Sequence, residues 1–173
     1  MKITYKADNP QNWIKNISRQ LNVPVIDGKI EVPETLGKGF IQQLTFSSDL
    51  TIYFFEIALK FPIKIIREES TNVNIFPIMF WISENDISQV TNKETKKLSL
   101  NSPYGIFFPS SHISTEMYLP ANEKISNITV VLSINWFTEN ILNTDFRRYY
   151  FYHNLILIFP LLLYFKFCEK YFT

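Results

Sequence analysis

The sequence predicts a mainly β protein, an antiparallel β-barrel or sandwich over residues 25–134 with a helix before it and another after it. Three observations lead to this prediction. Aromatic residues are abundant, with 16 Phe and 9 Tyr among 173 residues, and such side chains suit the half-buried faces of strands. Gly is scarce, with 4 residues. Short extended segments also follow one another at a spacing of about 8–12 residues, which is typical of sandwiches and barrels.

The first expected element is a helix within residues 1–24. Asn9 suits its N-cap, and Pro10 suits the first helical position, where the missing N–H costs nothing. Apolar residues then recur at helical spacing: Trp13, Ile14, Ile17 and Leu21. This pattern predicts a helix that packs on the outside of a sheet.

Residues 25–134 carry the pattern of strands. Asp27-Gly28 predicts a tight turn between two short extended pieces. The candidates that follow are apolar runs separated by polar or Pro-containing turns: 40–46, 50–57, 63–67, 75–83, 87–91, 97–100, 105–108, 115–119 and 125–134. The last of these alternates between an apolar face that includes Ile128 and a polar face that includes Asn127.

Residues 135–173 form a separate C-terminal region in this interpretation. Asn135 is a suitable N-cap for a short helix that carries Trp136 and Phe137. Further on, residues 155–165 are an uninterrupted apolar run, whereas a membrane-spanning helix needs about 20 such residues. We therefore expect this tail to pack against the barrel or against a second copy, and a membrane anchor is the less favoured alternative.

The composition of the chain excludes several classes of function. Seventeen Lys+Arg against sixteen Asp+Glu give a net charge of +1, which leaves little room for the concentrated basic surface of a DNA-binding module. Cys168 is the single cysteine, so an intrachain disulfide is excluded. The N-terminus lacks the apolar stretch of a signal peptide, so the cytoplasm is the predicted location.

Signatures of catalysis are missing from the sequence. It holds no Gly-rich phosphate loop, no H-E-x-x-H and no G-x-S-x-G. His112 follows Ser110-Ser111, which allows a Ser/His nucleophile pair, although a polar loop histidine is the simpler interpretation. We predict that the protein is not an enzyme, with no catalytic residue, no metal and no cofactor.

Four residues are candidates for contact with a small ligand inside the barrel: Phe54, Glu56, Trp81 and His112. Phe54 and Trp81 are aromatic residues on predicted strands, and His112 is a candidate for the rim. Glu56 follows Phe54 at a period of two, so it shares the face of that side chain. If this face points inward, Glu56 places a carboxylate in an apolar interior; alternatively, Glu56 lies at the exposed end of the strand.

The order of these features resembles the sensor domain of AraC-type transcriptional regulators. The resemblance rests on Asn12-Trp13-Ile14, Gly28, Pro33, the segment GKGFIQQLTFSSDLTIYFFEIAL (37–59), FWISENDISQV (80–90) and residues 98–137. It implies a cupin-like antiparallel β-barrel or jelly roll that binds a small-molecule effector and dimerises. In this family a separate C-terminal region with two helix-turn-helix units contacts DNA, and we expect this chain to lack that region and to make no direct nucleic-acid contact.

Two other functions stay open. A cupin-like enzyme needs a metal motif of two His and a carboxylate on one strand pair, but strands 40–46 and 50–57 contain no His, so such an enzyme would need an unorthodox site. A small membrane-associated protein is the other alternative. For assembly we expect a homodimer whose interface includes residues 136–165, the competing outcome being a tail that folds back onto its own core.

Overall fold

The computed structural model describes residues 1–6, 12–70, 74–91, 94–109 and 112–142. The chain divides into two compact units, Met1–Ile134 and Asn135–Thr173. The first unit is mainly β with one α-helix near its start, so the predicted fold class is confirmed. The predicted cap residues Asn9 and Pro10, and the whole apolar run 155–165, lie outside the described residues.

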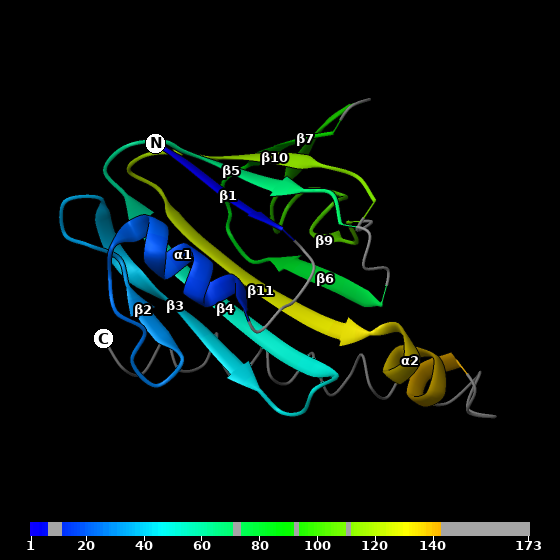
Figure 1. Cartoon of the computed structure of the whole chain (residues 1–173). Coiled ribbons are helices and arrows are strands. Elements are labelled where there is room, and N and C mark those ends of the chain that lie inside the picture. Colours follow the sequence, from blue (N-terminus) through cyan, green and yellow to red (C-terminus); the bar gives the residue numbers. More distant parts are fainter. Residues whose placement is uncertain (7–11, 71–73, 92–93, 110–111, 143–173) are drawn as a thin grey trace, which may run out of the picture. The chain divides into compact units, whose positions relative to one another are not determined.

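The described elements follow in chain order in Figure 1. They are β1 (Lys2–Lys6), α1 (Trp13–Leu21), β2 (Lys29–Glu31), β3 (Gly37–Thr45), β4 (Leu50–Leu59), β5 (Ile63–Glu68), β6 (Ile75–Trp81), β7 (Ile87–Val90), β8 (Thr95–Leu98), β9 (Ile106–Phe107), β10 (Thr115–Leu119) and β11 (Lys124–Ser133), then α2 (Ile134–Phe137) and a π-helical turn, Thr138–Leu142. Every strand predicted from residue 40 onward is present, with ends that differ by a few residues.

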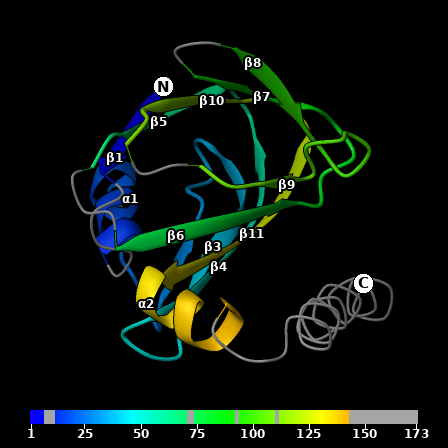
Figure 2. The ribbon, with the colours of Figure 1, turned by 90° about the vertical axis from the view of Figure 1, so that its right-hand side faces the viewer.

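The strands form two sheets. A five-stranded sheet has the order β1-β5-β10-β7-β8, and a six-stranded sheet has the order β2-β3-β4-β11-β6-β9. Figure 2 shows β5, β10 and β7 on one side of the interior and β6, β11, β3 and β4 on the other. One apolar core cluster draws on both sheets, with Tyr53 and Val131 from the six-stranded sheet and Ile63 and Ile87 from the five-stranded sheet.

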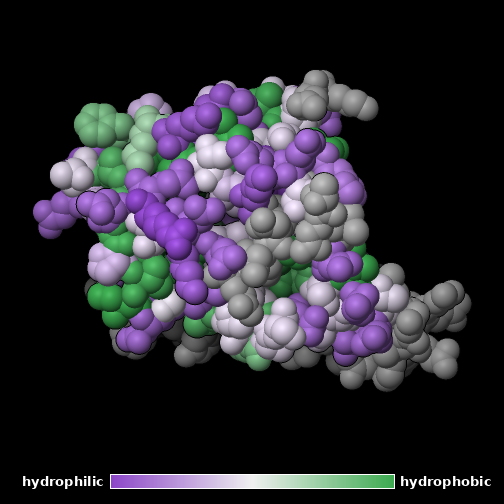
Figure 3. Space-filling model, in the orientation of Figure 1, coloured by the Kyte–Doolittle hydropathy of each residue, from purple (hydrophilic) through white to green (hydrophobic). Residues whose placement is uncertain are grey.

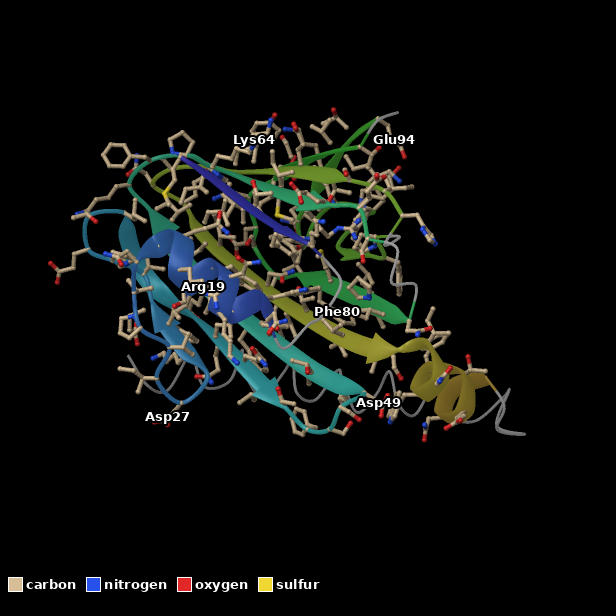
Figure 4. All side chains as sticks on the ribbon, in the orientation of Figure 1. Arg19, Asp27, Asp49, Lys64, Phe80 and Glu94 are labelled. Carbon is tan, nitrogen blue, oxygen red and sulfur yellow. The ribbon has the colours of Figure 1, made fainter. Side chains whose placement is uncertain are left out.

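Helix α1 packs beside an edge strand of each sheet. It contacts β1, which is an edge of the five-stranded sheet, and β2 and β3 at an edge of the six-stranded sheet (Figure 1). Trp13, Ile14 and Ile17 are its buried apolar residues, as their helical spacing predicts. Its outer surface is hydrophilic in Figure 3, and the labelled Arg19 belongs to that surface in Figure 4. The helix therefore closes the interior between the two edges.

The predicted Asp-Gly turn is confirmed. Asp27 and Gly28 both have positive φ, 49° and 72°, and the backbones of Ile26 and Lys29 exchange two hydrogen bonds of 2.9 and 2.8 Å. Positive φ at both central positions is the geometry of the type I′ hairpin turn, for which Asp-Gly is a preferred sequence. This turn leads the chain into β2 and β3.

The N-terminal segment differs from the prediction. We expect only a helix within residues 1–24, but residues Lys2–Lys6 form β1. This strand pairs in parallel with β5, with Tyr5 opposite Arg67, so the five-stranded sheet is not purely antiparallel. Five residues are too few to show a decisive period, and their pairing partner lies about 60 residues further along the chain. Tertiary pairing therefore determines the strand.

Candidate functional site

An interior cavity of about 80 Å³ lies between the sheets. Its walls come from α1 and from strands of both sheets, and aliphatic, aromatic and Met side chains make up nearly all of them. The side chains that line it from the six-stranded sheet include alternate residues of one strand: Tyr53, Phe55, Ile57 and Leu59 of β4. A volume of this size exceeds the roughly 10–15 Å³ that one water molecule needs. The first unit therefore has internal room for a compact molecule.

Aromatic rings form one wall of this cavity. The Trp13 ring from α1 stacks on the Tyr53 ring from β4, with centroids 5.4 Å apart and planes at 21°. Tyr5 from β1 lies 5.2 Å from Trp13, and Phe55 lies 6.4 Å from Tyr53. The wall thus joins β1 and α1, which follow one another in the chain, to the more distant strand β4. Burial raises the pKa of the Tyr53 phenol, and the neighbouring Tyr5 raises it further, so Tyr53 is a neutral group at ordinary pH.

Strand β11 supplies the amide and hydroxyl groups of the lining. Asn127 and Thr129 both line the cavity, and they are 5% and 2% exposed. The Thr129 hydroxyl donates to Asn127 Oδ1 at 2.6 Å, and Asn127 Nδ2 donates to the Phe80 carbonyl at 3.0 Å. These hydrogen bonds fix both side chains, so they form a rigid polar stripe in an apolar wall. The inward face of β11 is therefore its polar face.

Two indole groups add unused donors to the same region. Trp13 and Trp81 line the cavity and are 4% and 5% exposed. Neither indole N–H has a hydrogen-bond partner among the residues that the structure describes. A buried N–H without a partner carries a desolvation cost of about 1–3 kcal/mol, so both rings are held in place by packing around the cavity.

A polar row continues the inner face of the five-stranded sheet beyond the cavity lining. Arg67 of β5 is 2% exposed; its Nε donates to Thr115 Oγ1 at 3.3 Å and its Nη2 to the Ile113 carbonyl at 2.8 Å. Burial lowers the pKa of this guanidinium, and the neighbouring Tyr5 opposes the effect. Gln89 of β7 is 1% exposed, and neither atom of its amide has a partner in the described part of the chain. The interior thus has an apolar part and a polar end.

The four residues predicted as ligand contacts lie in different places. Trp81 of β6 lines the cavity. Phe54 and Glu56 share one face of β4, as predicted, but it is the outer face of the sheet, since Tyr53, Phe55 and Ile57 line the cavity. Inward placement of Phe54 and Glu56 is therefore wrong by one residue of register, because both faces of β4 are apolar and periodicity does not distinguish them.

Glu56 and His112 lie in polar surroundings. The Glu56 side chain is 47% exposed and pairs with Lys124 at 3.4 Å, which agrees with the alternative of an exposed carboxylate. His112 is exposed in the segment that leads into β10. The structure therefore brings none of the other three residues to Trp81 in the cavity. Ligand contact by any of the four stays a prediction.

The sequence prediction missed most of the cavity lining. The sequence did signal Trp13, as a buried position of the helix, but nothing local connected it with β4. Tyr5 and Arg67 gave no signal, since their neighbourhood depends on the parallel pairing of β1 with β5. Asn127 and Thr129 were visible as one polar face of β11, and a polar stripe on a central strand is the signal that could have identified them.

Neither a metal site nor a membrane span is present in the described part of the chain. No group of three His, Cys, Asp or Glu side chains that could hold a metal ion occurs within residues 1–6, 12–70, 74–91, 94–109 and 112–142. No helix in the same ranges is long and apolar enough to cross a membrane.

No protein-family model matches the sequence, and no curated protein matches it either. Solved structures with a similar fold include a cupin domain of Cnp3 from Schizosaccharomyces pombe, with a TM-score of 0.44 and 9% identity over 58% of this chain and 68% of that chain. The Cupin_2 domain of an XRE family transcriptional regulator from Enterobacter cloacae gives a TM-score of 0.41 and 6% identity over 61% and 96%. KdgF from Halomonas sp. gives 0.41 and 9% over 63% and 83%. At identities this low the similarity concerns the fold alone.

Proposed function

We propose that this chain is the ligand-sensing domain of a transcriptional regulator of the AraC type that its sequence resembles. The observation that carries the proposal is the cavity between the two sheets. Small-molecule sites in proteins are concave and mostly apolar, with a few fixed polar groups that orient the ligand. The cavity has this composition: aromatic and aliphatic walls, and the Asn127–Thr129 pair held by hydrogen bonds.

The position of the cavity supports a sensing role. Its lining includes residues of α1, β1, β4, β5, β6, β10 and β11, so a bound molecule would touch both sheets and the helix. A ligand that binds the folded state alone also stabilises that state, by an amount that rises with the free ligand concentration. As the sensor of a regulator, the domain would act in the cytoplasm and would leave DNA contact to another region.

Tryptophan fluorescence offers a direct test, because two of the three Trp residues line the cavity and the third, Trp136, lies in α2. The Trp136→Phe chain keeps only the two cavity reporters. We expect neutral, compact apolar probes such as cyclohexanol and cyclohexanecarboxamide to cause a saturable change in its emission and to raise its melting temperature. In the double variant Trp136→Phe/Trp81→Phe, which keeps Trp13 alone, the same probes should give a smaller change in emission.

The contrary result is equally clear. A linear, non-saturating response to every probe, with no rise in melting temperature at millimolar concentration, would show that the cavity is a packing void and would end the sensor proposal. Binding that changes only the emission of Trp136 in the unmodified chain would place the site elsewhere.

We also propose a homodimer whose interface includes residues 136–165. The support is the apolar composition of this region, because an exposed apolar stretch of this length favours association. Sedimentation velocity of the intact chain against a chain that ends at Asn143 tests the assembly. We expect a dimer and a monomer respectively. A monomeric intact chain at micromolar concentration would contradict the proposal, and so would a dimer that survives the truncation.

A further inference from the structure

Two donors in the wall of the cavity have no hydrogen-bond partner among the residues that the structure describes. They are the indole N–H groups of Trp13 on α1 and Trp81 on β6, and both side chains line the cavity. Trp13 is 4% exposed and Trp81 is 5% exposed, so bulk water does not satisfy either group. An indole N–H donates and cannot accept, so an acceptor atom is what both positions lack.

The amide and hydroxyl side chains of the same wall already have hydrogen bonds. The Thr129 hydroxyl donates to Asn127 Oδ1, and Asn127 Nδ2 donates to the Phe80 carbonyl. Trp81 lies directly opposite Asn127 in the register of β6 and β11. Within the described ranges, the buried side-chain atoms of lining residues that lack a partner are the two indole nitrogens. The groups of the wall without a partner are therefore donors.

The charge of the wall restricts the ligand further. None of the described residues that line the cavity is Asp, Glu, Lys, Arg or His. An ionised ligand would therefore lose its hydration without gaining an opposite charge. A hydroxyl group brings a proton that itself needs an acceptor, whereas a carbonyl or ether oxygen only accepts. This wall therefore favours a neutral ligand whose polar group is an acceptor alone.

We propose that the ligand of this cavity is a compact, neutral molecule with an apolar body and a carbonyl or ether oxygen, which accepts a hydrogen bond from the indole N–H of Trp13 or Trp81. This ligand class rests on the proposed ligand-binding function and deepens it. The apolar body contacts the aromatic and aliphatic side chains of the wall, and the oxygen removes the cost of a buried donor without a partner. A molecule of the same shape without the oxygen gains only the apolar contacts.

A matched pair of probes tests the hydrogen bond. Cyclopentanone and methylenecyclopentane have the same ring and differ in the replacement of the carbonyl oxygen by a CH₂ group. In NMR spectra of the full chain labelled with ¹⁵N, each of the three Trp residues gives its own indole N–H signal, and single Trp→Phe variants assign them. We expect cyclopentanone to move the proton signal of Trp13 or Trp81 downfield in a saturable way. Methylenecyclopentane should bind without a downfield shift, and neither probe should move the signal of Trp136.

Affinities then show what the hydrogen bond contributes. Calorimetric titration gives the dissociation constants of both probes, and their ratio cancels the loss of ring size in a Trp→Phe variant. Replacing the tryptophan whose signal moves should weaken cyclopentanone relative to methylenecyclopentane by roughly two- to tenfold. Trp136→Phe makes the same change in α2, outside the described lining, and should leave the ratio unchanged. Melting temperatures report whether each variant is folded.

Infrared spectroscopy examines the unmodified chain, so it does not depend on the folding of a variant. The carbonyl band of bound cyclopentanone should lie at a lower wavenumber than in hexane, because a hydrogen bond weakens the C=O bond. Bound cyclopentanone with the band position found in hexane, or with no downfield shift at Trp13 or Trp81, overturns the ligand class and leaves the sensor proposal intact.

The remaining outcomes are also decisive. Equal downfield shifts with both probes overturn the ligand class, and so does an unchanged ratio of affinities in a folded variant that lacks the assigned N–H. Absence of saturable binding by both probes overturns it as well. If cyclohexanol and cyclohexanecarboxamide also fail to bind, the proposed function is refuted together with the ligand class.

Discussion

A larger side chain on β5 that points into the cavity tests whether the cavity is free space or is already filled by packing. Ile65 lines the cavity and is half-buried, although β1 and β10 flank it on both sides, so its accessible surface faces the interior. Ile66 is the next residue and lies on the opposite face of the same strand. The matched variants Ile65→Phe and Ile66→Phe therefore make the same chemical change on the two faces of one strand.

The expected change in the free energy of unfolding follows from the number of carbons that the substitution adds. Phe carries three more side-chain carbons than Ile, and burial of apolar groups contributes about 0.8 kcal/mol per carbon, so a ring that enters free space stabilises the protein by at most about 2.4 kcal/mol. For a unit of this size, that free energy corresponds to a rise in melting temperature of roughly 5–10 °C. If the space were already filled, overpacking would instead cost about 1–3 kcal/mol. The two cases differ in sign.

Differential scanning fluorimetry measures the shift in melting temperature, and titration with cyclohexanecarboxamide measures the affinity of the cavity for this probe. We expect Ile65→Phe to raise the melting temperature and to abolish binding of the probe, because the ring occupies its place. Ile66→Phe should change stability by less than about 0.5 kcal/mol and leave binding unchanged. A lower melting temperature for Ile65→Phe would refute the internal room, and undiminished probe binding in that variant would refute the cavity as the site.

Three further predictions concern single side chains. Thr129→Val removes the donor to Asn127 Oδ1 and should lower the free energy of unfolding by about 1–2 kcal/mol in urea denaturation, whereas Thr95→Val, at an exposed position of β8, should cost far less. The raised pKa of Tyr53 means that its stabilising contribution is complete below about pH 10, the unfolded value, and is lost as pH rises above it, so Tyr53→Phe should melt with a weaker dependence on pH in the alkaline range. An equally steep alkaline loss in Tyr53→Phe would assign the effect to other groups. Glu56→Ala breaks an exposed pair with Lys124 and should cost less than about 1 kcal/mol and leave probe affinity within twofold; a large loss of binding would return Glu56 to the site.

The strands could be predicted from the sequence, but the direction in which each strand faces could not. On β4 the set Leu50, Ile52, Phe54 and the set Tyr53, Phe55, Ile57 are both apolar, so alternation does not identify the inner one. On β11 the inner residues Asn127 and Thr129 are the polar ones, which reverses the usual rule for a half-buried strand. In both strands the lining of the cavity is decided by the neighbouring strands.

The polar end of the interior could not be predicted for a different reason. Arg67 in isolation is typical of the exposed end of a strand, since charged residues are seldom fully buried. It is an interior group because β5 lies between β1 and β10, which place Tyr5 and Thr115 on either side of it. A local pattern carries no information on a pairing between segments this far apart. Of the four residues predicted as ligand contacts, Trp81 is the one that lines the cavity, and the sequence indicated it because it ends a strongly apolar strand.

The place of β11 in the six-stranded sheet has a consequence for synthesis of the protein. This strand pairs with β4 on one side and with β6 on the other, yet among the strands that the structure describes it is the last to leave the ribosome. About 70 residues separate the end of β4 from the end of β11, which at 5–20 residues per second corresponds to roughly 4–15 seconds of translation. Throughout that interval β4 exposes an unpaired edge with apolar side chains, and β6 does so as well once it has been made. The nascent chain is then most open to edge-to-edge association, and a chain truncated before Lys124 would lack β11 and with it the centre of the larger sheet.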